Sequence, residues 1–340
     1  MNAFRSHNDK DLLPNAQVNS KGKFFWFKIV DEQLIWILLL LLFLITTAII
    51  PKFFSLQNIQ NLALNSSILG ILVIAETLCL LVGKFDLSIE STLAITALIG
   101  AIMTNKMGFN PILTWVVVLL LGAIIGLFNG VLIVKVGVNP FVQTLSMMII
   151  LRGLMLVFTG GITVFPLPQI YRAFGATKIL TVPTPIIILV LLYVFFIVIL
   201  EKRQIGRFIY ATGSNSEAAY TSGVNVNKIN ILVFTLSGLI AAFAGLVLSG
   251  RLNAVDNNLA KGMVFEVMAA SVIGGISLAG GRGRLLGALG GVLFLGMVGS
   301  VLTWLNVQPF MVETVRGIII LVAVVIDAVK NKIREKLLMI

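Results

Sequence analysis

The chain has 340 residues, of which 58% are hydrophobic and only 11% are charged. A soluble domain is about 45–50% apolar and about 25% charged, and the interior of one chain of this size could not cover so much apolar surface. The composition excludes a soluble enzyme or nucleic-acid-binding protein, despite the net charge of +11, and predicts a polytopic membrane protein.

Ten apolar segments are predicted to cross the membrane, because a spanning helix needs roughly 20 mostly apolar residues. Together they predict an all-α bundle over residues 33–329, in which some helices are broken. Residues 1–32 and 330–340 are predicted to be tails. The spans lie near 33–51, 62–83, 87–105, 112–134, 140–158, 184–200, 231–250, 264–280, 285–305 and 312–329, with boundaries least defined around 62–105 and 264–305.

The distribution of basic residues predicts the orientation of these spans. With the N-terminus in the cytoplasm, the inside loops and tails hold 17 Lys and Arg residues and the outside loops hold 6. Cytoplasmic loops of membrane proteins carry such an excess. Both tails are therefore expected to lie in the cytoplasm.

Two interruptions break the apolar pattern, one at Val82–Ser88 and the other at Gly274–Gly281. Irregular backbone at membrane depth is tolerated only where protein or a water-filled cavity covers it. Broken segments in both halves of a chain indicate a transport pathway. Asp86, within the first break, is the preferred functional carboxylate.

Small residues recur at four-residue steps, a spacing that lets helices approach closely in lipid. Close packing within one subunit is the favoured interpretation, and a seam between two subunits is the alternative. The residues are Gly122, Gly126 and Gly130, then Ala241, Gly245 and Ser249, then Gly283, Gly287 and Gly291.

The largest internal polar segment is 201–230, which the topology places in the cytoplasm. Ser214 and Glu217 fit a capping box that would start a short helix, and Gly223 would end it. Such a helix could dock into a partner or could simply link two spans.

This segment resembles a known motif. Glu217-Ala218-Ala219 followed by Gly223 is similar to the Glu-Ala-Ala-x-x-x-Gly loop of ABC importer permeases, and Gly206 to Asn215 resembles the preceding stretch in the ribose, arabinose, galactoside and xylose permeases. Further resemblances occur in the expected order, so that the matches run from about residue 55 to 328, which is most of the chain. They are Gly83 to Ser88; Pro140, Phe141, Thr144 and Leu145 with Arg152 and Gly153; and Gly274 to Gly283.

The resemblance implies a permease subunit in the inner membrane of a bacterium, importing a ribose-like monosaccharide. Implied partners are ABC ATPase subunits, a periplasmic sugar-binding protein and a second permease subunit, identical or not; no nucleic acid is expected. The implied ATPase-docking residues are Gly206, Arg207, Ser214, Asn215, Glu217, Ala218, Ala219 and Gly223. The pathway candidates are Gly83, Asp86, Ser88, Glu90, Thr144, Arg152, Gly274, Gly275 and Ser277.

The chain itself is not expected to be an enzyme. It has no Gly-x-x-x-x-Gly-Lys-[Ser/Thr] loop to hold ATP phosphates, so ATP would be hydrolysed on a partner. A single cysteine, Cys79, and a single histidine, His7, predict no metal site, and no cofactor is expected.

Two departures from the family pattern leave an alternative open. Lys84 and Glu90 stand where the family usually has glycine. On a continuous helix Asp86 and Glu90 would share a face and repel, and Lys84 could offset that repulsion. The alternative function is a proton-coupled secondary transporter that uses Glu76, Asp86 and Glu90 as a relay. The partner of Arg152 and the identity of the sugar are left open.

Overall fold

The computed structural model describes residues 33–50, 53–308, 311, 312, 314, 315, 317–322, 324, 325, 328 and 329. Both predicted tails, 1–32 and 330–340, lie outside these residues, as does part of the predicted last span. The described chain is mainly helical, and its strands form one two-stranded antiparallel ribbon. The predicted all-α membrane bundle is thereby confirmed.

The first described helix is Gln33–Ile49. The elements that follow are α2 (Leu56–Leu81), α3 (Ile89–Asn105), α4 (Pro111–Val131), the π-helix η1 (Leu132–Val136), α5 (Pro140–Thr159), α6 (Ala173–Ala176), β1 (Lys178–Ile179), β2 (Val182–Pro183), α7 (Thr184–Lys202), α8 (Gln204–Ser214), α9 (Ser216–Thr221), α10 (Val226–Leu252), α11 (Met263–Ile273) and α12 (Leu285–Trp304).

Two of the long helices begin with the same capping sequence, an asparagine followed by a proline. Asn110 caps α4 and Asn139 caps α5 through their side-chain oxygens, and each is followed by a proline at the first helical position. Asparagine satisfies free backbone N–H groups there, and proline needs no hydrogen-bond acceptor for its own nitrogen. The local sequence therefore fixes where both helices start.

The predicted number of ten spans is higher than the number of long helices in the described residues. Six helices are long and apolar enough to cross a membrane, namely α2, α4 with η1, α5, α7, α10 and α12. Helix Gln33–Ile49, α3 and α11 are apolar but shorter. Helix α11 has 11 residues, or about 16 Å, because the turn at Gly274 and Gly275 ends it. It cannot cross a hydrocarbon core of about 30 Å, so the predicted span 264–280 is corrected to a short helix and a turn.

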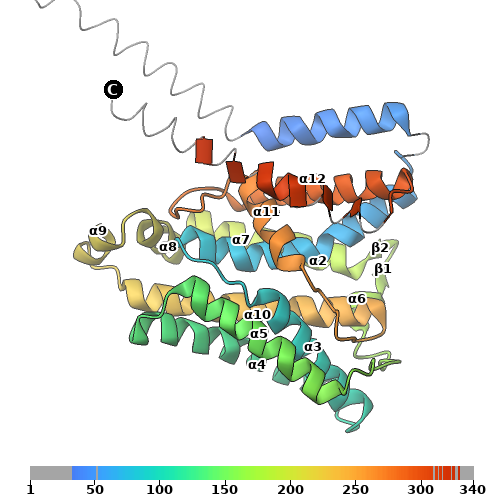
Figure 1. Ribbon diagram of the computed structural model, residues 1–340, viewed down its shortest axis with the longest axis horizontal. Helices are drawn as coiled ribbons and strands as arrows, with labels where there is room; N and C mark the ends of the chain where they lie inside the picture. Colours follow the sequence, from blue (N-terminus) through green and yellow to red (C-terminus); the bar gives the residue numbers. More distant parts are fainter. Residues whose placement is uncertain are drawn as a thin grey trace, which may run out of the picture.

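Helix α2 lies at the centre of the bundle. In Figure 1 it runs between α12 and α10, and it packs against α7, α10, α11 and α12. Of its most apolar stretch, 89% is buried, against 33% or less in α4, α5, α7 and α12. Helices α7, α10, α11 and α12 therefore cover α2, while α4, α5, α7 and α12 present more of their apolar surface outward.

Close glycine contacts join α4 to α10. Gly126 faces the backbone of Phe234 and Gly238, and a Cβ atom at Gly130 would come within 3.0 Å of Ile231 Cα. The stripe Gly122–Gly126–Gly130 thus packs within the chain, which confirms the favoured interpretation for this stripe.

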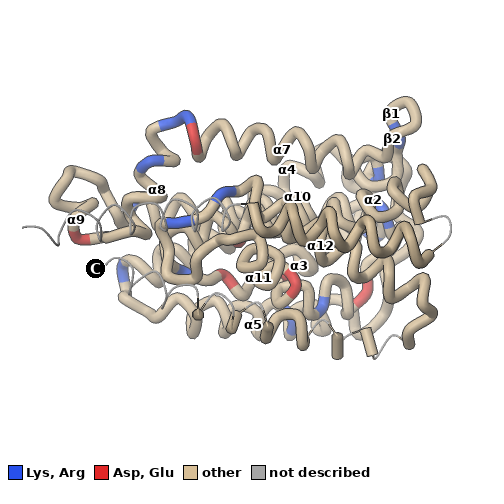
Figure 2. The backbone as a smooth tube through the Cα atoms, turned by 90° about the horizontal axis from the view of Figure 1, so that it is seen from above, with Lys and Arg blue, Asp and Glu red and all other residues tan. Residues whose placement is uncertain are grey.

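The outer surface is rich in large apolar side chains, including Leu120 and Ile124 on α4, Ile149 on α5, and Leu191 and Phe195 on α7. Figure 2 shows charged residues near the two ends of the long helices and a further group between them, beside α3, α5 and α11. Lipid tails would cover the apolar band, as expected of a multi-pass membrane protein.

Candidate functional site: two broken segments and the helices that contact them

The two interruptions predicted from the sequence lie against each other in the structure. The N–H of Gly281 donates a 2.9 Å hydrogen bond to the carbonyl of Leu81, at the end of α2. A Cβ atom at Gly280 would come within 2.7 Å of the Gly83 nitrogen. The turn after α11 therefore packs directly on the turn after α2, and glycine permits the close approach.

Helix α8 lies on this pair of turns. The Tyr210 hydroxyl donates to the carbonyl of Gly283 at 2.8 Å, and the Ser214 hydroxyl donates to the carbonyl of Gly281 at 3.3 Å. A Cβ atom at Gly213 would come within 2.6 Å of the Gly281 nitrogen and closer still to the Leu81 carbonyl. The segment predicted to dock a partner thus touches both broken turns.

The start of α9 differs from the predicted capping box. Ser214 is the last residue of α8, and Asn215 caps α9 by accepting from the N–H of Ala218 at 2.9 Å. Asparagine caps a helix at least as well as serine. The hydroxyl of Ser214 instead donates a hydrogen bond to the carbonyl of Gly281. Gly223, with φ of +86°, follows the short helix as expected.

The predicted docking residues differ in exposure. Arg207, Glu217 and Ala218 are exposed, and Tyr220 beside them is 72% exposed. Gly206 and Ala219 are buried and hold α8 and α9 against the bundle. The free surface of this segment is therefore formed by one short helix and the outer side of α8.

Inside the bundle, Asp86 fixes the start of α3. One carboxylate oxygen accepts from the Ser88 N–H at 3.1 Å and from the Ser88 hydroxyl at 2.6 Å, and the other accepts from the Ser237 hydroxyl on α10 at 2.8 Å. Asp86 precedes the helix, so it does not share a helical face with Glu90. The expected repulsion on a continuous helix does not apply.

A buried polar chain extends from Ser88 to α5. The side-chain amide of Asn129 donates to the Ser88 hydroxyl at 3.0 Å, and Gln143 donates to the Asn129 oxygen at 3.2 Å. Asn129, Gln143 and Ser237 are not among the site residues predicted from the sequence. Asn129 and Gln143 are polar residues within apolar helices, and that signal could have found them.

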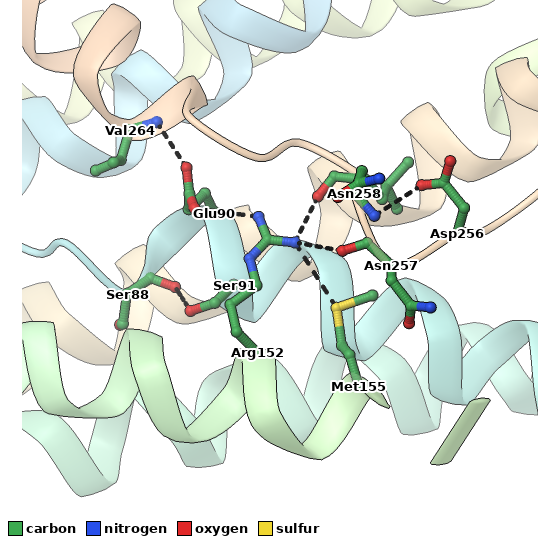
Figure 3. Close-up of polar contacts among 10 residues, drawn as sticks. Ser88, Glu90, Ser91, Arg152, Met155, Asp256, Asn257, Asn258 and Val264 are labelled. Atoms are coloured by element: carbon green, nitrogen blue, oxygen red, sulfur yellow. Dashed lines mark hydrogen bonds and ion pairs between the residues drawn. The ribbon is translucent and has the colours of Figure 1, made fainter. Parts of the chain in front are cut away.

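Glu90 and Arg152 form the buried ion pair of this region, shown in Figure 3. Arg152 Nη2 lies 3.1 Å from one Glu90 oxygen, and the other oxygen accepts from the Val264 N–H at 3.2 Å. Arg152 Nη1 donates to the carbonyls of Leu259 at 2.9 Å and Asn257 at 3.4 Å. Arg152 therefore has both an acidic and a carbonyl partner, and the charge of Glu90 is offset by Arg152.

The remaining pathway candidates divide between the two regions. Gly274, Gly275 and Ser277 lie in the turn between α11 and α12. Thr144, on α5, donates to the carbonyl of Pro140 at 2.9 Å and lies 3.5 Å from the carbonyl of Phe85. The sequence candidates thus form one group at the paired turns and a second around the starts of α3 and α11.

No group of metal-binding side chains occurs in the described part of the chain. The site consists of glycine turns, hydroxyls, amides and one ion pair. Such groups can position helices and pass a neutral polar solute, and nothing among them forms a catalytic set.

Comparison with known proteins gives consistent matches over most of the chain. A family model described as branched-chain amino acid transport system / permease component matches residues 58–324. The ribose import permease of Escherichia coli K12 is 36% identical over 322 residues, which cover 93% of this chain and 99% of that protein. That of Bacillus subtilis is 37% identical over 295 residues, covering 86% and 91%.

An L-arabinose ABC transporter permease of Azospirillum brasilense is 32% identical over 309 residues, which cover 91% of each chain. No solved structure matches the chain.

Proposed function

The chain belongs to the permease family of monosaccharide ABC importers, and from that premise we propose that it carries ribose or a closely related pentose across the inner membrane. Relatives named for ribose import are 35–37% identical to it, and those named for arabinose are 32–34% identical. The sugar would cross unmodified, since a permease subunit is not an enzyme.

We propose that ATPase subunits dock on α8 and α9 from the cytoplasm, with both chain termini on that side. Glu217 and Tyr220 on α9 and Arg207 on α8 provide an exposed polar surface for such a partner. A periplasmic binding protein would deliver the sugar at the opposite end, and a second permease subunit would complete the pathway.

One observation carries the proposal. Helix α8 is hydrogen-bonded to the turn after α11 and packed on the turn after α2, through Tyr210, Gly213 and Ser214. A force applied to α8 and α9 therefore reaches both broken segments without an intervening flexible linker. Alternating access driven by a partner ATPase requires such a mechanical link.

The proton-coupled alternative has less support. No hydrogen bond between described residues joins the carboxyl groups of Glu76, Asp86 and Glu90 to one another. The Asp86 carboxylate accepts hydrogen bonds from Ser88 and Ser237. The Glu90 carboxylate accepts them from Arg152 and from the Val264 N–H. A relay would need these groups to exchange protons directly or through water.

The docking proposal is tested by purifying the tagged chain from mildly solubilised membranes of its own cells. We expect an ATPase subunit to copurify with the parent chain and to be lost from Glu217→Lys. A matched control is Lys178→Glu, which also changes the charge by two units but lies on β1, at the end of the molecule away from α9 (Figure 1). Equal ATPase recovery from both variants would contradict the docking site.

The substrate proposal is tested by uptake of labelled ribose into cells with and without the chain. We expect chain-dependent uptake that unlabelled ribose suppresses fully, arabinose suppresses less, and leucine leaves unchanged. An uncoupler that spares ATP should not stop the uptake. Suppression by leucine, or collapse of uptake with the proton gradient alone, would count against the proposal.

A further inference from the structure

Helix α11 starts inside the protein without a side-chain cap from its own segment. A helix start leaves N–H groups without intrahelical acceptors and carries partial positive charge. Glu90 supplies what is missing, because its carboxylate accepts from the Val264 N–H at 3.2 Å. The cap thus comes from the first turn of α3, which ties the two short broken helices together.

The same carboxylate links α11 to α5 through Arg152. Its guanidinium binds Glu90 on one side and the carbonyls of Leu259 and Asn257 on the other. Figure 3 shows Arg152 reaching from α5 to the loop that precedes α11. Residues 256–264 are therefore attached at both ends to one ion pair.

Holding a loop by this ion pair has a high free-energy cost, because two charged groups are removed from water. The Glu90 side chain is 6% exposed and that of Arg152 is 19% exposed. Burying both charges costs about as much as their attraction returns, whereas removing one leaves an uncompensated buried charge. Apolar packing would hold residues 256–264 at least as firmly. The pair therefore specifies where residues 256–264 lie more than it adds to the stability of the fold.

The backbone of this segment agrees with that view. Ala260 has φ of +57° and Gly262 has φ of +83°, between the carbonyls bound by Arg152 and the N–H bound by Glu90. A left-handed alanine is strained and persists only where surrounding contacts hold it. Release of the ion pair would let this turn relax.

We propose that Glu90 is a positioning residue for transport: with Arg152 it holds residues 256–264 closed against α3 and α5, and the pair separates when the pathway opens. The proposal rests on the proposed transport function and adds the element that moves.

The test measures opening directly, by labelling a buried cysteine with a membrane-impermeant maleimide. Cys79 is replaced by alanine, and Leu259, which is 4% exposed, becomes the reporter through Leu259→Cys. This change keeps the backbone carbonyl that Arg152 binds. We expect slow labelling in this parent and labelling faster by about tenfold or more after Glu90→Gln or Arg152→Gln, since each breaks a charged hydrogen bond.

Three controls make the result specific. Glu201→Gln breaks the exposed ion pair with Arg284 and should leave the labelling rate unchanged. The double variant Glu90→Gln/Arg152→Gln should be no faster than the faster single variant, because the two charges act together. A parallel series that keeps buried Cys79, without the reporter, measures general unfolding.

Equal labelling of the parent and both single variants would overturn the proposal. Faster labelling of Cys79 in step with the reporter would also overturn it, because the pair would then support the whole fold and not one segment. The assay needs neither sugar nor ATPase. The positioning role can therefore fail while the importer function stands, and a failed uptake experiment leaves the labelling result unaffected.

Discussion

The hydroxyl of Tyr210 on α8 donates a 2.8 Å hydrogen bond to the carbonyl of Gly283, in the turn before α12. Ser214 contacts the same turn through Gly281, one helical turn further along α8. Two hydrogen bonds thus fix one side of α8 to the second broken segment. A helix held at two points transmits rotation as well as translation.

Replacing Tyr210 with phenylalanine removes one of these two attachments and keeps the ring. We expect the free energy of unfolding to fall by about 1 kcal/mol, the usual net worth of one hydrogen bond. We expect sugar uptake to fall several-fold while ATP hydrolysis by the copurified complex is retained, because the motion of α8 would reach the turn less completely. Parallel assays of uptake and hydrolysis measure this ratio, and equal losses in both would contradict a coupling role.

The protonation of Tyr210 gives a separate prediction. Burial raises the pKa of its hydroxyl above 10.0, nearby Glu201 adds to the rise, and Arg284 opposes it. Because the folded-state pKa is raised, the bond to Gly283 is fully present below pH 10 and is lost only as the pH rises through the raised value. The stability difference between the parent and Tyr210→Phe should therefore stay constant from neutral pH to about pH 10. Thermal unfolding of both proteins across this range measures it.

Gly213 is expected to be intolerant of any side chain. A Cβ atom there would meet the Leu81 carbonyl and the Gly281 nitrogen, both of them backbone. We expect Gly213→Ala to lower the free energy of unfolding by about 1–3 kcal/mol, because neither turn can yield without losing its packing. Gly299→Ala on α12 is the matched control, since nothing lies within 4 Å of its Cβ position and alanine favours a helix by about 1 kcal/mol. Similar melting temperatures for the two variants would refute this close packing.

The sequence predicted the broken segments because glycine and charge interrupt long apolar runs, and both breaks occur near Gly83 and Gly274 as expected. It could not predict that the two broken segments meet, because the contact joins backbone atoms of Leu81 and Gly281, which are 200 residues apart in the sequence. A hydrogen bond from Gly281 N–H to Leu81 oxygen leaves no signature in residue type. The predicted span 264–280 was too long, because the apolar composition continues past Ile273, whereas helix α11 ends there.

The sequence predicted that Arg152 has a partner but not that the partner is Glu90. Arg152 and Glu90 are charged residues within apolar segments, so each was expected to have a partner. The sequence did not show which acidic residue pairs with Arg152, because several lie within predicted spans. The choice depends on the placement of α3 beside α5, which is a tertiary property. Likewise the cap at Asn215 replaced Ser214 because the serine hydroxyl lies within reach of Gly281.

The buried polar chain yields a prediction at Asn129. Its amide donates to Ser88 and its oxygen accepts from Gln143, so the residue must be both a donor and an acceptor. Asn129→Asp keeps the shape of the side chain but removes its N–H donor. It also places a negative charge beside the Ser88 hydroxyl, whose own hydrogen is already donated to Asp86. We expect a loss of at least about 1–3 kcal/mol in the free energy of unfolding, the cost of an unsatisfied buried polar group, with a larger loss if the new carboxyl ionises.

Thermal unfolding in detergent measures the loss at Asn129, and the effect should shrink at low pH. Protonation of the new carboxyl restores an O–H that can donate to Ser88, so stability should recover as the pH falls through its pKa. Asn225→Asp is the control, because Asn225 is exposed and only accepts, from the Lys228 N–H at 3.0 Å, which a carboxylate does equally well. A pH-independent loss at Asn129, or an equal loss at Asn225, would show that the donor role of Asn129 does not stabilise the start of α3.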